Sequence, residues 1–119
     1  MKLSNKIVYI VTLTAGISLA SAAEDCGESP LDKPNLPSLT SVTASTLKSA
    51  RDRTVVFSER VDNYMGCMDR QGRKLLPHLT KKQQARWEED LTEVHENRRQ
   101  LQIALNDLIR SFRKQTASK

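Results

Sequence analysis

The residues with the most chemical potential do not form a catalytic or metal-binding pattern. His95 and Glu96 begin a motif that in zinc proteases places a second histidine one helical turn later, but that position is Arg99. The other histidine, His78, lies far away in the sequence, and no serine lies within a nucleophile motif. The four acids between residues 88 and 93 are typical of a solvated helix face. The sequence therefore predicts a non-enzymatic protein with no metal site and no cofactor.

Cys26 and Cys67 are the only cysteines. In an oxidising compartment two cysteines most simply pair with each other. The bond would close a loop of about 40 residues and stabilise the fold by roughly 3–4 kcal/mol through chain entropy. A reactive thiol, a metal site and an intermolecular bridge are the alternatives, but there is no C-x-x-C motif and no histidine at ligand spacing. We expect an intramolecular disulfide.

The start of the chain predicts export. Lys2 and Lys6 precede an apolar stretch over residues 7–19, which ends in the small residues Ala20-Ser21-Ala22-Ala23. This order is that of a secretory signal peptide. The apolar stretch is also shorter than the roughly 20 residues that a membrane span requires. We expect residues 1–22 to be a signal peptide, cleaved after Ala22 or Ala23, and the mature protein to be periplasmic or secreted.

A cluster of positive charge is the strongest candidate for a contact surface. Loss of Lys2 and Lys6 would reduce the net charge from +5 to +3, and export makes nucleic acid an improbable partner. Between residues 70 and 86 there are nevertheless six cations and no acid, with Trp87 next in the chain. Ordinary solubility is one interpretation; contact with an anionic envelope surface or an acidic protein is the other. The candidate residues are Arg70, Arg73, Lys74, Lys81, Lys82, Arg86 and Trp87.

Two heptad stripes must position this cluster. Apolar or small residues recur every three or four positions over two stretches, which predicts helices over about 44–69 and 81–114. Joined by a short connector over residues 70–79, they should fold as an antiparallel hairpin over residues 43–119. The fold class is all-α, because no strand-like alternation recurs. The first stripe is Leu47, Ala50, Thr54, Phe57, Val61, Tyr64 and Met68, and the second is Trp87, Leu91, Val94, Arg98, Leu101, Leu105, Leu108 and Phe112.

Local signals predict the helix ends. Thr43 or Ser45 can serve as the first N-cap, and Gly72 fits a helix stop. Thr80 and Gln83 have the spacing of a capping box.

Facing residues of the two stripes predict a register. Pairing Tyr64 with Trp87 places Thr54 opposite Arg98, the one charged residue in either stripe. The Arg98 stem would pack while its head reaches solvent or Asp52. A polar layer that fixes register and partner number is the alternative.

Residues 23–42 are rich in proline and should be extended. Anchored by the disulfide near the turn, this segment would lie as a strap in the groove between the helices. Three leucines would fill the groove and cover the end of the second helix: Leu31, Leu36 and Leu39.

Two resemblances bear on function. Cys26-Gly27, the spaced prolines, Tyr64-Met65-Gly66-Cys67-Met68 and a long terminal helix resemble small uncharacterised exported proteins of Gram-negative bacteria, which implies a periplasmic location and no known activity. Leu79-Thr80-Lys81-Lys82-Gln83 is similar to the L-T-x-x-Q element of Spy/CpxP periplasmic stress chaperones, which repeat it within curved helical dimers. Here it occurs once, and a helix cap explains it.

We therefore expect a helical module that binds another protein, whose identity the sequence does not give. A periplasmic holdase chaperone or envelope-stress accessory protein is the alternative. The oligomeric state stays open, because a heptad face pairs equally well with its own chain or with a second copy.

Mass spectrometry of the protein recovered from a periplasmic fraction tests the predicted export. We expect the chain to begin at Ala23 or Glu24, because signal peptidase cleaves after small residues. A mature chain that still begins at Met1 would contradict the signal peptide.

Overall fold

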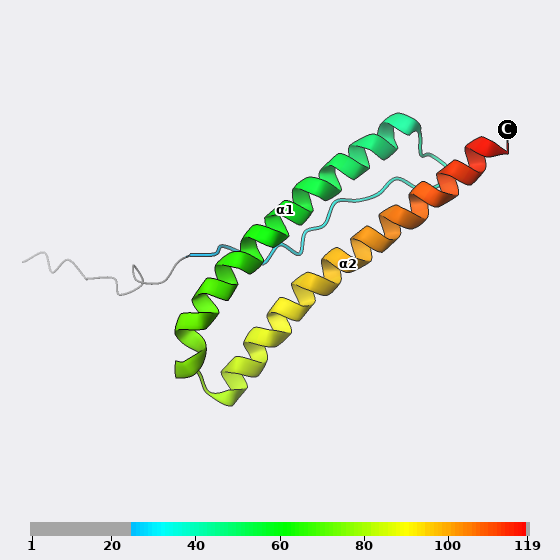
Figure 1. The fold of residues 1–119 in the computed structure, drawn as a ribbon. Helices are drawn as coiled ribbons and strands as arrows, with labels where there is room; N and C mark the ends of the chain where they lie inside the picture. The colour runs from blue at the N-terminus through cyan, green and yellow to red at the C-terminus, as the bar shows by residue number, and fades with distance from the viewer. Residues whose placement is uncertain (1–24, 119) are drawn as a thin grey trace, which may run out of the picture.

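The protein is a two-helix hairpin with an extended segment along one face (Figure 1). The computed structural model describes residues 25–118, so the predicted signal peptide and its expected cleavage site lie outside the described residues. Helix α1 (Ala44–Leu75) leads through the short 3-10 helix η2 (Leu76–His78) to helix α2 (Lys81–Ala117). Residues 25–118 contain no strand, so the predicted all-α hairpin is confirmed.

Reciprocal caps begin both helices. The Thr43 hydroxyl accepts from the Thr46 amide at 3.1 Å, while the Thr43 amide donates to the Thr46 hydroxyl at 2.8 Å. Thr80 and Gln83 form the predicted capping box, with distances of 3.2 and 3.0 Å. Each cap satisfies amides that the first turn of a helix leaves unpaired. Thr43, rather than Ser45, is therefore the N-cap of α1.

The first helix is longer than predicted. It continues past residue 69 to Leu75, so most of the predicted connector is helical. Gly72 does not stop the helix: it is buried, and a Cβ built on it would lie 3.6 Å from Cζ2 of Trp87. Leu76 and the Trp87 indole both pack against Gly72, at ordinary van der Waals distance from that Cβ position. The helix thus continues through Gly72 although glycine in a helix interior costs roughly 1 kcal/mol relative to alanine.

The longer helix changes the register. Trp87 lies against Gly72 instead of Tyr64, and Arg98 donates to the carbonyl of Ser58 at 3.4 Å instead of facing Thr54. Both partners lie one to two turns further along α1 than predicted. In an antiparallel hairpin the position of the turn determines which residues of the two helices face each other. Because α1 ends later than predicted, every residue of α2 faces a later residue of α1.

Arg98 keeps its predicted character but has a different partner. Its side chain is 18% exposed, and its guanidinium pairs with Asp62 rather than with Asp52. The stem therefore packs between the helices while the head reaches a carboxylate that is itself exposed. The Thr54 hydroxyl donates instead to the carbonyl of Ala50 in its own helix at 2.8 Å.

The core is a thin seam between the helices. Val61 and Val94 are completely buried, and Phe57, Tyr64 and Leu101 surround them. All five belong to the predicted stripes, so the heptad pattern identified the buried face although the register was wrong.

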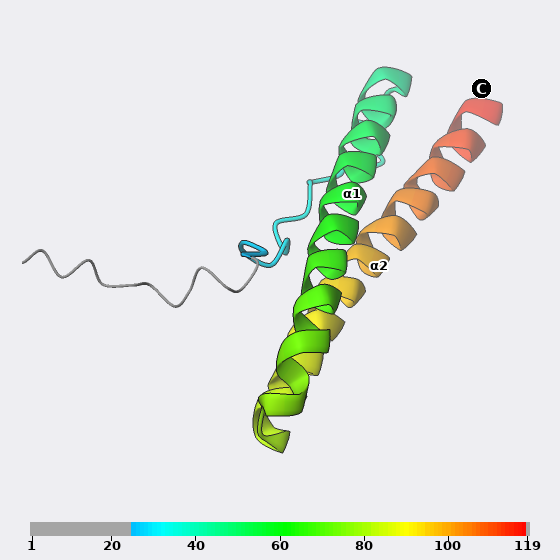
Figure 2. The same cartoon turned by 60° about the vertical axis from the view of Figure 1, so that its left-hand side comes forward.

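The strap, residues 25–42 of the described chain, lies on one face of the hairpin (Figure 2). The Leu31 carbonyl accepts from Asn97 of α2 at 3.0 Å, and the Asn35 carbonyl accepts from Arg53 of α1 at 3.3 Å. These bonds connect the strap to both helices. Pro30 is buried and Leu36 packs against the core.

The leucines of the strap do not all fill the groove as predicted. Leu31 and Leu39 are each 39% exposed. The residue that the strap buries fully is Pro30. Backbone carbonyls and a proline therefore make contacts that the sequence analysis assigns to leucines.

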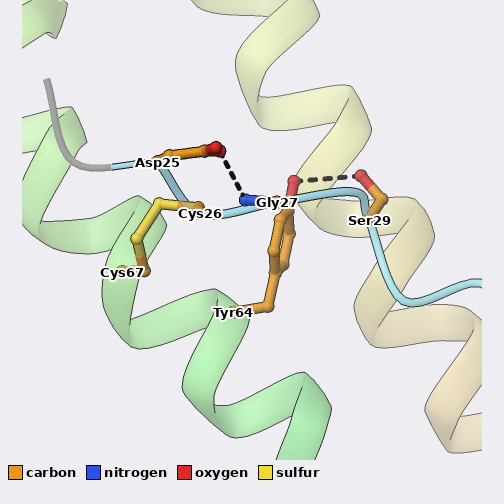
Figure 3. Close-up of a disulfide and its surroundings, with 6 residues drawn as sticks. All are labelled: Asp25, Cys26, Gly27, Ser29, Tyr64 and Cys67. Carbon is orange, nitrogen blue, oxygen red and sulfur yellow. Dashed lines mark hydrogen bonds between the residues drawn. A yellow bond between two sulfur atoms is a disulfide. The ribbon is translucent and has the colours of Figure 1, made fainter. Parts of the chain in front are cut away.

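A disulfide between Cys26 and Cys67 holds the start of the strap (Figure 3). The Cα atoms of the two cysteines are 5.6 Å apart. Gly27 adopts a left-handed φ of 73°, and its amide donates to Asp25 at 2.9 Å. The hydroxyls of Ser29 and Tyr64 then share a hydrogen bond of 2.9 Å. Because α1 extends two turns past Cys67, the disulfide lies well before the turn instead of close to it.

A pair of substitutions on α2 tests the seam. Leu101→Ala should lower the free energy of unfolding by about 2–4 kcal/mol, because Leu101 is 3% exposed and its loss leaves a cavity. Ile103→Ala is the matched control and should change it by less than about 0.5 kcal/mol, because Ile103 is 45% exposed. Urea unfolding followed by circular dichroism measures both. Equal losses would show that the buried face is assigned wrongly.

Candidate contact surface

The predicted contact residues gather around the turn but do not form one patch. Lys82, Arg86 and Trp87 line a hollow of about 660 Å³ beside the turn. Arg70 instead lines a depression next to the disulfide, together with Asp25 and Glu28 of the strap. The structure therefore separates Arg70 from the other candidates. Because its surroundings include two acids, it belongs to the attachment of the strap.

We call the first of these the turn-end hollow. Its apolar part comes from both sides of the turn, with Leu75 from α1 and Trp87 from α2. Leu75 is 37% exposed and Trp87 is half-buried. The remaining lining residues are Leu79, Lys82, Gln83, Ala85, Arg86, Glu89 and Asp90.

Neighbouring acids reduce the charge of this end. Arg73 pairs with Asp69 at 2.9 Å and Arg86 with Asp90 at 3.8 Å. Both acids lie just outside the acid-free stretch that the sequence shows, one helical turn from their partners. Exposed pairs of this kind contribute little to stability, but they engage two of the five cations that lie at this end apart from Arg70.

The lysines are the cations that stay available. Lys74, Lys81 and Lys82 are exposed, and none has an ion-pair partner among residues 25–118. Lys81 and Lys82 occupy the first turn of α2, whose amides are already capped by Thr80 and Gln83. Their ammonium groups therefore extend into solvent from a rigid helix end.

Gln84 fixes the shape of the turn. Its side-chain amide donates to the carbonyls of Leu76 and Leu79 at 2.9 and 3.2 Å. The Leu76 carbonyl also accepts from the Leu79 amide at 3.2 Å, so Gln84 adds a second bond there and supplies the Leu79 carbonyl with a donor. Gln84 thereby bonds the start of α2 to the turn that separates Leu75 from Trp87.

The zinc-protease-like stretch is a solvated helix face. Arg99 donates to Glu96 at 2.8 and 2.9 Å, and this hydrogen bond lowers the pKa of the Glu96 carboxyl. The same hydrogen bond raises the pKa of Arg99. Within residues 25–118 no three His, Cys, Asp or Glu side chains cluster in a way that would hold a metal ion.

The sequence missed two parts of the surface. Leu75 was assigned to a loop, and only the extension of α1 makes it part of the turn-end hollow. A second hollow at the opposite end of the hairpin involves Leu47 and Phe112, which the predicted register kept apart. The cations near Phe112 were interpreted only as complements to the helix dipole.

No protein family, no curated protein and no solved structure matches the chain. In the described part of the chain, no helix combines the length and the apolar character needed to cross a bilayer.

Proposed function

We propose that the protein is an exported, non-enzymatic interaction module that contacts an anionic envelope surface through its turn end. The observation that carries the proposal is the composition of the turn end. Leu75, Trp87 and Lys82 line the hollow, and Lys74 and Lys81 are the chain neighbours of Leu75 and Lys82. All three lysines are exposed and have no ion-pair partner among residues 25–118, and Gln84 bonds α2 to the turn.

The chemistry of this end suits a headgroup layer. A lysine near an anionic lipid surface contributes about 1 kcal/mol of attraction. An indole has an apolar body and one polar N–H, a combination that favours the interfacial region. Trp87 is half-buried, so we expect it to contribute an edge rather than to insert fully.

The position of the strap also favours the turn end as the contact surface. The strap bonds to Asn97 near the middle of α2 and to Arg53 in the first third of α1, and its disulfide lies two turns before the end of α1. No residue of 25–42 lines the turn-end hollow. The hollow is thus accessible with the strap in place.

Co-sedimentation with vesicles that contain phosphatidylglycerol tests the proposal. A turn-end variant, with Arg73, Lys74, Lys81 and Lys82 all changed to Gln, should bind at least about tenfold more weakly, because it loses three unpaired lysines and one arginine. Binding of the wild type should also fall between low and high salt, because salt screens exposed charges beyond about 8–10 Å.

The control is an open-end variant that removes the same number of positive charges from the other end of the hairpin, with Lys48, Arg51, Arg113 and Lys114 changed to Gln. All eight positions are exposed, so both variants should remain folded by circular dichroism. Equal weakening by the two variants would mean that net charge alone drives sedimentation. Equal sedimentation of the wild type and the turn-end variant would contradict the proposal that the turn end contacts the anionic surface.

A further inference from the structure

The end of the hairpin opposite the turn carries a second hollow, which we call the open-end groove. It lies between the first turns of α1 and the last turns of α2, at the end where the C-terminus is marked in Figure 2. Its volume is about 720 Å³. Leu47 from α1 and Ile109 and Phe112 from α2 supply its apolar surface, and all three are only partly buried.

Cations line both sides of this groove. Lys48 and Arg51 lie on α1, and Arg110 and Arg113 lie on α2. Within each pair the residues are three apart, which places them on the same helix face one turn apart. No acid lines the groove.

Most of these charges lack a partner within the protein. Arg110 pairs with Asp107, but Lys48, Arg51 and Arg113 have no ion pair among residues 25–118. Three unpaired cations around partly exposed apolar side chains form a surface that is complementary to acids flanking an apolar stripe.

The strap does not occupy the groove. None of the residues 25–42 lines it. On α1 the strap bonds to Arg53, whereas the groove uses Arg51, which lies on a different face because a helix turns about 100° per residue. The groove is thus a second hollow of the hairpin, separate from the one along which the strap lies.

We propose that the open-end groove binds an acidic amphipathic helix of a partner protein. The apolar stripe of that helix would contact Leu47, Ile109 and Phe112, and carboxylates on its two sides would face the cations of α1 and α2. A third helix there would cover the ends of α1 and α2 as in a small helical bundle.

The distribution of charge favours this partner over a single-headed fatty acid. One carboxylate would contact the cations of one side only, whereas this groove has cations on both sides and over a full turn. An amphipathic helix carries several carboxylates at the matching one-turn spacing. The inference goes beyond the proposed function, because it concerns the opposite end of the hairpin and stands whether or not the turn end binds an anionic surface.

Fluorescence anisotropy with two synthetic helical peptides of about 18 residues tests the inference. Both carry leucine at heptad positions a and d; one has glutamate at e and g and the other has lysine. The wild type should bind the glutamate peptide and not the lysine peptide. Changing Lys48, Arg51 and Arg113 to Gln should weaken binding about tenfold, because each exposed ion pair alters the equilibrium about twofold.

A charge-reversal variant guards against simple loss of structure. The double variant Arg51→Glu, Arg113→Glu should no longer bind the glutamate peptide and should bind the lysine peptide instead. An unfolded protein would not show this exchange of specificity. The turn-end variant, with Arg73, Lys74, Lys81 and Lys82 changed to Gln, is the matched control. It should bind the glutamate peptide as the wild type does.

Three results would overturn the inference. The first is no binding of the glutamate peptide to the wild type, and the second is equal binding to the wild type and the Gln variant. The third is self-association of the wild type in sedimentation equilibrium that the Gln variant abolishes, because a second copy would then occupy the groove.

Discussion

The Cys26–Cys67 disulfide is the constraint on which the remaining structure depends. Two helices can bury only the stripes that face each other, and here that seam contains few fully buried side chains. The disulfide holds the strap against this seam, so that Pro30 and Leu36 add apolar contacts that the helices alone lack. Such support adds to the stability of a small domain, because small domains bury a lower fraction of their surface than large ones. The covalent bond also reduces the entropy that the strap loses when it orders.

The position of the disulfide determines which surfaces stay accessible. Because α1 continues past Cys67, the strap begins well before the turn and leaves the turn-end hollow uncovered by any residue of 25–42. At the other end, the strap joins α1 at Thr43 without entering the open-end groove. The two ends differ in character. The turn end has a tryptophan beside one lysine and two further lysines nearby in the chain, whereas the open end has cations on both sides of aliphatic and phenyl side chains. We propose that an anionic surface contacts the first and a protein helix the second.

The sequence predicted those features that depend on nearby residues. Heptad spacing identified Val61 and Val94 as core, and the spacing of Thr80 and Gln83 identified the cap. The pairing of Cys26 with Cys67 followed from their being the only two cysteines. The register was wrong because it depended on the end of α1. We predicted the end of α1 from Gly72, a residue typical of helix ends. In the structure Gly72 lies inside α1 and packs against Trp87.

Only part of the candidate contact surface could be predicted, because the rest depends on contacts between residues that are far apart in the sequence or on different helices. Counting charges along the chain found the cations around the turn, but not that Asp69 and Asp90 lie one turn from Arg73 and Arg86. Nor could the sequence pair Leu47 with Phe112, since their proximity follows from the corrected register.

Amide hydrogen exchange before and after reduction of the disulfide tests the central claim most directly. In the oxidised protein we predict the slowest exchange around Val61 and Val94, where the helices and the strap pack together. Reduction should accelerate exchange at both sites by at least about 100-fold, because a loop closure worth roughly 3–4 kcal/mol is lost. Unchanged protection of Val61 and Val94 after complete reduction would show that the hairpin is stable without the disulfide, which would contradict the account.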